Sequence, residues 1–118
     1  MAVPFKAPVK DITFGYEVID SYKILNKISE FSDFSEDIVI PTMEECAKFS
    51  EEVLAPINAI GDQQGATIDN GVVKMPQEFV DAYKKFAEAG WASISLPEEI
   101  GGGGQPITLS GGTLEILS

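Results

Sequence analysis

The sequence predicts a mainly α-helical fold with one small β-hairpin. Apolar residues recur every three to four positions in several segments, which is the period of an amphipathic helix. The pair Asn70-Gly71 stands between β-branched residues, a strong short-range signal for a hairpin turn. The chain has 118 residues, of which 44% are hydrophobic, so it is long enough for one domain with a modest core.

The first expected helix follows a proline-containing leader. Asp11 can cap this helix, and its apolar stripe recurs at spacings of four, four and three residues: Phe14, Val18, Tyr22 and Leu25. Gly15 weakens it by roughly 1 kcal/mol relative to alanine, so we expect the helix to depend on packing against the rest of the protein. We interpret residues 1–34 as an N-terminal extension, which is joined to the next element by an acidic, serine-rich loop.

The clearest amphipathic helix is expected to begin at a cap formed by Ser35. Its apolar face consists of Met43, Cys46, Phe49, Val53, Ile57 and Ile60. Pro41 removes a backbone donor near the start of this helix. An interior proline costs about 3 kcal/mol, so we expect a kink at Pro56. Gly61 is expected to stop the helix.

The next two elements carry their own turn and cap residues. The segment from 65 to 74 is expected to form two short strands around Asn70-Gly71. Pro76 then suits the first position of a helix and Gly90 suits its C-terminal stop. The apolar face of this helix is formed by Phe79, Val80, Tyr83, Phe86 and Ala87.

A glycine-rich loop precedes the last expected helix. The apolar pattern after Pro106 predicts that helix, and Gly111-Gly112 weakens it, so we expect poor order there. This pattern has no C-cap and stays apolar almost to its end. We therefore expect residues 35–118 to form one helical domain that is incomplete at its C-terminus.

Charge and residue types exclude several classes of function. The eight basic and nineteen acidic side chains give a formal net charge of −11, which disfavours nucleic acid and anionic membranes as partners. With one cysteine and no histidine, the chain lacks the groups for a disulfide, a Cys/His zinc site or an imidazole-based triad. We predict no metal-binding residue, no membrane span and a cytoplasmic location.

Some residues allow a chemical and a structural interpretation. Glu98-Glu99 resembles a carboxylate pair, but adjacent residues in a loop usually point apart, so we favour a solvated turn. The run from Gly101 to Gly104 has the composition of a phosphate cradle. It lacks the Gly-Lys-Ser/Thr ending of a P-loop, so we favour a flexible connector. Cys46 is interpreted as a buried, inert thiol and Trp91 as a core anchor.

Several motifs follow one another in a specific order: Glu51-Glu-Val-Leu-Ala-Pro56, Gly61-Asp62 with Gly65, Gly90-Trp91, and Leu96-Pro-Glu-Glu-Ile-Gly-Gly102. This order resembles the N-terminal domain of the acyl-CoA dehydrogenases. The leader from Lys6 to Phe14 is similar to that of a branch with an extra N-terminal segment, which includes enzymes acting on 3-methylthiopropanoyl-CoA. The sequence departs from the family pattern at Ile100, where an aromatic residue is common, and in its four consecutive glycines.

The resemblance implies a three-part enzyme that oxidises an acyl-CoA to the 2,3-enoyl-CoA. In that family FAD lies between a middle β domain and a C-terminal helical domain, reaches the neighbouring subunit of a homo-oligomer, and works with a carboxylate base of the C-terminal domain. This chain would supply a cavity wall and support for the remaining domains, with no catalytic or cofactor-binding residue of its own. Alone it is expected to be inactive.

Candidate cavity-lining residues are Ile107, Leu109 and Leu114, because the resemblance favours the last helix as a wall of the acyl cavity. Plain core packing is the alternative interpretation of these side chains. An alternative for the whole chain is a stand-alone helical interaction module. Such a module would dock on a dehydrogenase or another partner through an exposed apolar face.

Overall fold

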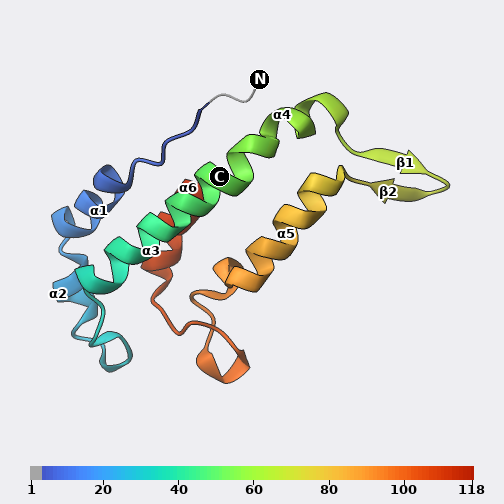
Figure 1. Ribbon diagram of the computed structural model, residues 1–118. Helices are drawn as coiled ribbons and strands as arrows, with labels where there is room; N and C mark the ends of the chain where they lie inside the picture. Colours follow the sequence, from blue (N-terminus) through green and yellow to red (C-terminus); the bar gives the residue numbers. More distant parts are fainter. Residues whose placement is uncertain (1–3) are drawn as a thin grey trace.

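The computed structural model describes residues 4–118 and has the predicted mainly helical fold with one hairpin (Figure 1). Its helices are α1 Val9–Val18, α2 Ser21–Leu25, α3 Glu36–Phe49, α4 Ala55–Gln64, α5 Gln77–Ala89 and α6 Ile107–Leu117, and its strands are β1 Thr67–Asp69 and β2 Val72–Lys74. Short 3-10 turns lie at Ser29–Phe31, Trp91–Ser93 and Glu98–Ile100. Helices α3 and α4 form the long axis, with α1 and α6 packed against α3 and with α5 beside α4.

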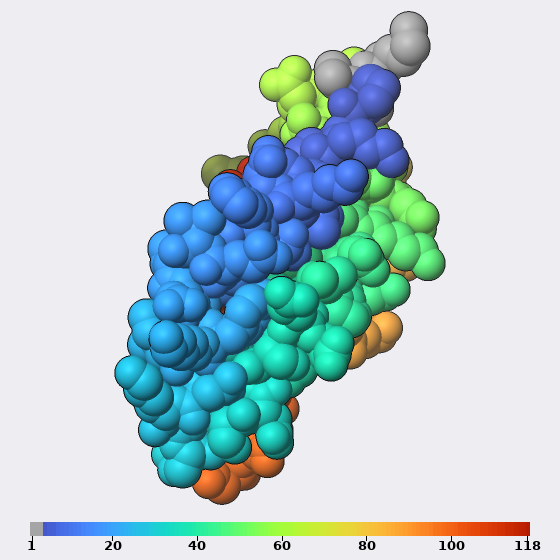
Figure 2. Space-filling model, turned by 90° about the vertical axis from the view of Figure 1, so that its left-hand side faces the viewer, coloured from blue at the N-terminus to red at the C-terminus, as the bar shows by residue number. Residues whose placement is uncertain are grey.

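The N-terminal segment folds as two short helices, so the prediction of one continuous helix is wrong. The chain turns between α1 and α2 at Asp20, whose φ of 58° is left-handed. Half of the predicted apolar stripe is wrong, because Phe14 and Val18 are 62% and 64% exposed. Ile12 and Tyr16 face the core instead. The other half is confirmed, since Tyr22 and Leu25 pack against the core. Figure 2 shows this segment as a ridge that runs along the length of α3.

The first turn of α1 also differs from the prediction. The residue at the N-cap position is Pro8, and Asp11 lies inside the first turn. A carboxylate there still interacts favourably with the positive end of the helix. The prediction that Asp11 caps this helix is therefore wrong, since the helix begins at Val9.

The core lies where α1, α3 and α6 meet. It brings together the two ends of the chain and the middle: Ile12, Tyr16, Phe34, Val39, Met43, Cys46, Leu109 and Ile116. Ser35 precedes α3 in extended conformation, as predicted for its cap position, but its side chain makes no capping hydrogen bond. Because α1 contributes two buried side chains, the N-terminal extension is part of the same core as the rest of the chain.

A π-helical segment, Ser50–Leu54, joins α3 to α4. It lies just before Pro56, and Pro56 occupies the first turn of α4, where its missing N–H costs little. The predicted stop at Gly61 is wrong, since α4 continues to Gln64 and ends at Gly65. Gly61 instead faces Phe79 of α5, whose ring lies where a β-carbon on residue 61 would stand. This glycine allows α4 and α5 to approach closely.

The hairpin and α5 form where the sequence predicts them. Asn70 and Gly71 both have positive φ, 49° and 76°, as the tight hairpin turn requires. The strands pair antiparallel, with Ile68 opposite Val73, and every strand residue is exposed. Helix α5 follows Pro76 and ends at Gly90, whose φ is 79°.

Helix α6 is formed without interruption, contrary to the expectation of poor order at Gly111-Gly112. Gly112 is buried against α1 and α3, while Gly111 faces outward. Side-chain bonds secure the start of the helix, because the hydroxyls of Ser95 and Ser110 bond to each other and Ser95 also donates to the Pro106 carbonyl. Tertiary contacts therefore outweigh the low helix propensity of the two glycines.

Candidate functional site

The candidate cavity residues lie on opposite sides of α6. Ile107 and Leu114 point outward and are 80% and 66% exposed. Leu109 is 1% exposed and packs in the core with Met43 and Ile116. Ile107 and Leu114 are thus available to line a cavity that another part of a protein completes, and Leu109 instead holds the helix in place.

The glycine-rich loop is closed by its own backbone hydrogen bonds. The N–H groups of residues 101–105 donate, in order, to the carbonyls of Glu98, Pro97, Ser93, Leu96 and Ile94, at distances from 2.9 to 3.1 Å. A phosphate cradle needs N–H groups that point at the ligand. None of these five N–H groups is free to bind a phosphate. The same bonds hold residues 93–105 in a fixed loop, which we call the glycine-rich clip, where the sequence predicts a flexible connector.

Close backbone packing explains two of the four glycines. A β-carbon on Gly102 would collide with the backbone of Leu96, and one on Gly103 would lie 2.7 Å from the Ile94 carbonyl oxygen. The loop therefore folds back onto the segment that leads into it. The clip sets the position from which α6 begins.

The acidic side chains and the one cysteine are groups of this chain that could take part in acid-base chemistry, metal binding or nucleophilic attack. Glu98 and Glu99 are exposed in a 3-10 turn, as the solvated-turn interpretation predicts. Among residues 4–118, no group of three His, Cys, Asp or Glu side chains is placed to hold a metal ion. Cys46 is fully buried, and burial raises the pKa of its thiol to about 11, so at neutral pH it is an inert thiol as predicted.

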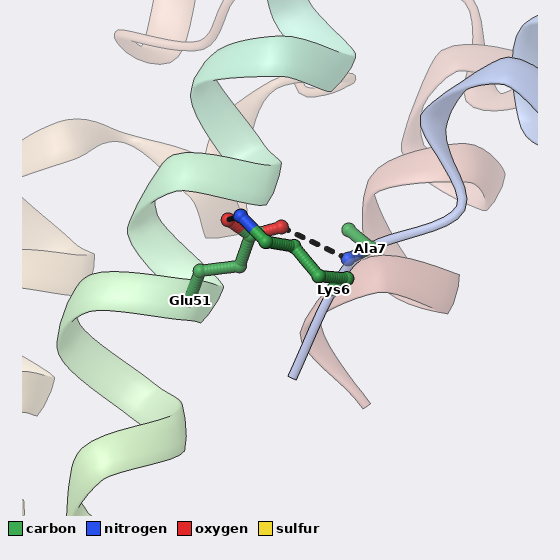
Figure 3. Close-up of polar contacts among 3 residues, drawn as sticks. All are labelled: Lys6, Ala7 and Glu51. Carbon is green, nitrogen blue, oxygen red and sulfur yellow. Dashed lines mark hydrogen bonds and ion pairs between the residues drawn. The ribbon is translucent and has the colours of Figure 1, made fainter. Parts of the chain in front are cut away.

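Glu51 fixes the N-terminal segment to the π-helical turn, a role that no local pattern in the sequence marks. Its carboxylate accepts a hydrogen bond from the Ala7 N–H at 3.0 Å and one from Lys6 Nζ at 3.2 Å, as Figure 3 shows. These two hydrogen bonds lower the pKa of Glu51 below its ordinary value, and the bond from the Ala7 N–H has the larger effect. Glu51 lies within the π-helical segment that joins α3 to α4, and these two bonds hold residues 6 and 7 against that segment.

Tyr16 links the two ends of the domain. Its hydroxyl donates to the Thr108 carbonyl at 2.6 Å, across 92 residues of sequence. Burial raises the pKa of this phenol, so it stays protonated and remains a donor. No local pattern in the sequence marks this bond, because its partner is a backbone atom far along the chain.

Between α1 and α6 lies an open groove of about 400 Å³. Its floor is formed by Ile12 and Tyr16, and glycines stand on both walls, Gly15 on α1 and Gly111 on α6. A separate hollow of about 520 Å³ lies between the middle of α3, the end of α5 and the glycine-rich clip. Both are shallow surface features.

Comparisons with known proteins place these elements in a family. A family model described as "Acyl-CoA dehydrogenase, N-terminal domain" matches residues 41–118. The chain is also 34% identical, over 114 residues, to a protein named 3-methylmercaptopropionyl-CoA dehydrogenase from Ruegeria pomeroyi. That match covers 97% of this chain and 19% of the relative, so the chain spans about a fifth of the relative's length. In the part of the chain that is described, no helix has both the length and the apolar character needed to cross a membrane.

Proposed function

The chain belongs to the acyl-CoA dehydrogenase family as an N-terminal domain, and from this premise we propose that it forms part of an enzyme that oxidises an acyl-CoA to the 2,3-enoyl-CoA. The reaction requires a flavin as electron acceptor and a carboxylate base, which the family resemblance assigns to other domains. The name of the Ruegeria relative, which refers to a thioether acyl-CoA, supports an acyl thioester as the substrate.

In this enzyme the chain supplies a wall of the acyl cavity and support for the remaining domains. The observation that carries this role is the outward placement of Ile107 and Leu114 on α6, which are 80% and 66% exposed. Removing an apolar side chain from water lowers the free energy of the assembly, and an acyl chain or a neighbouring domain can cover these two side chains.

The glycine-rich loop, residues 101–105, does not fit the diphosphate of FAD. The N–H groups of residues 101–105 donate to carbonyls of the same loop region. The basic residues of the whole sequence are eight lysines, with no arginine. We therefore place the flavin contacts in the other domains of a full enzyme, which we propose to be a homo-oligomer. We also propose that residues 1–34 are an extension of the family domain, which is consistent with a family match that begins at residue 41.

A fusion protein tests this function. This chain would be joined to the part of the Ruegeria relative that follows the matched segment. We expect the fusion to bind FAD and to reduce it when an acyl-CoA is added, while the 118-residue chain alone binds none. A folded fusion that holds no flavin would contradict the proposal. That result would support the stand-alone interaction module, an alternative that the family match by itself does not favour.

A further inference from the structure

We propose that the groove between α1 and α6 is the seat of a helix from the remaining part of a dehydrogenase chain, and that this helix carries a basic residue. The inference rests on the proposed function and adds to it a defined contact surface. The groove is distinct from Ile107 and Leu114, neither of which is among its lining residues.

The walls of the groove are shaped for a backbone. Gly15 and Gly111 lie within helices, where glycine costs roughly 0.5–1 kcal/mol relative to alanine. Among residues 4–118, a β-carbon added at either position would meet no tertiary neighbour within 4 Å, so no tertiary contact there requires these glycines. A second helix lying in the groove does require them, because glycine lets two backbones approach closely.

The acidic side chains that line the groove favour a partner with a basic residue. Asp11 on α1 and Glu115 on α6 both line it, and both are exposed. Ile19 adds an apolar side chain that is 61% exposed. A helix with an apolar face and a Lys or Arg at its edge matches this surface, whereas a second copy of this chain brings a net charge of −11.

The surface area and the length of the relative are consistent with a large partner. A compact protein of 12.7 kDa exposes about 6,200 Å², whereas this chain exposes 8047 Å². The excess of about 1,800 Å² exceeds the roughly 800 Å² that each partner buries in a standard interface. The relative has about four-fifths of its length outside the matched segment, which supplies the chain for such a partner.

The test places Gly111→Leu in both the isolated chain and the fusion described above, with Glu88→Leu on the exposed side of α5 as the control. We expect Gly111→Leu to leave the melting temperature of the isolated chain unchanged or raised, because its side chain enters open space. In the fusion the same change should lower the melting temperature by several degrees, because the leucine occupies the seat of the docked helix. The control, Glu88→Leu, should lower the melting temperature of neither the isolated chain nor the fusion.

A second pair of variants in the fusion tests the charge of the partner. Glu115→Lys should lower the melting temperature of the fusion more than Glu115→Gln, because it places two like charges together. The docking inference is overturned if Gly111→Leu is harmless in the fusion, if it destabilises the isolated chain equally, or if it converts a dimer of the isolated chain into a monomer. Equal effects of the two Glu115 variants would overturn it as well.

Flavin content separates the two proposals. A fusion that holds flavin and tolerates Gly111→Leu contradicts the groove and leaves the function standing. An unmodified fusion that folds without flavin contradicts the function, and the docking inference falls with it.

Discussion

Glu51 shows how one side chain can position a whole segment. It bonds both the main chain of Ala7 and the side chain of Lys6, so the extended N-terminus is fixed at the π-helical turn. The carboxylate is the better acceptor when ionised, and these bonds lower its pKa. The stabilisation is therefore present above the ordinary glutamate pKa and is lost as pH falls through the lowered value.

We expect the amide resonance of Ala7 to shift with pH and to report a midpoint below that of an ordinary glutamate. Nuclear magnetic resonance of the labelled chain measures this directly. In Glu51→Gln the shift should disappear, and the Ala7 amide should exchange faster with solvent at a fixed pH. A midpoint at or above the ordinary value would contradict the hydrogen bond from the Ala7 N–H.

The adjacent glycines of α6 provide a matched pair of substitutions. A β-carbon on Gly112 would lie 2.5 Å from the Tyr16 hydroxyl and 2.6 Å from Met43 Cε, whereas one on Gly111 would touch nothing. In urea denaturation, Gly112→Ala should lower the free energy of unfolding by about 1–3 kcal/mol through overpacking. Gly111→Ala should raise it by roughly 0.5–1 kcal/mol. Effects of the same sign at both positions would contradict the orientation of α6.

At the scale of the element, the hairpin is held by its turn, its strand pairing and one exposed ion pair, between Lys74 Nζ and Asp69 Oδ2 at 2.8 Å. Asn70 and Gly71 have positive φ, and none of the strand residues is buried. An isolated two-stranded hairpin is marginally stable, so it should open without disturbing the core. Its opening and the unfolding of the domain are expected to be independent.

Gly71→Ala should therefore abolish the cross-strand contact between Ile68 and Val73, because a side chain at positive φ costs roughly 1–2 kcal/mol. The midpoint of urea unfolding, followed by circular dichroism, should remain that of the parent chain. Asn70→Gly is the matched control and should keep the hairpin closed. A lower unfolding midpoint in Gly71→Ala would show that the hairpin contributes to the core.

The elements that could be predicted from the sequence are those with local signals. Ser35 before α3, the Asn70-Gly71 turn and Gly90 after α5 each act through the backbone of their own neighbours. Gly61 lies inside α4 against Phe79 of α5, a contact between elements that periodicity cannot reveal. The break at Asp20 likewise has no signal in the apolar spacing. The inward or outward placement of Ile107, Leu109 and Leu114 likewise became clear only once α6 was packed against α3.

As a whole the molecule is a thin plate. Its principal extents are 54 × 34 × 17 Å, and its radius of gyration is 16.9 Å. A compact domain of this length has a radius of gyration of about 13.5 Å. The plate therefore leaves broad faces uncovered, as expected of a domain whose family relative is about five times longer.

Solution scattering should reflect this shape. For the monomeric 118-residue chain we expect a radius of gyration near 16.9 Å, and α6 should keep its contact with α3. A value near that of a compact sphere would mean that the isolated chain rearranges. Size-exclusion chromatography with light scattering should accompany the measurement, because exposed apolar faces favour association.

The bond from Tyr16 to Thr108 and the core that surrounds it also set the order of events during synthesis. Ile12 and Tyr16 are made early, while their partners Leu109 and Ile116 are made about a hundred residues later. A ribosome adds roughly 5–20 residues per second, so the first helix waits for several seconds without its partner. During that interval its apolar side chains are open to chaperones, and the domain can close only after α6 has left the ribosome.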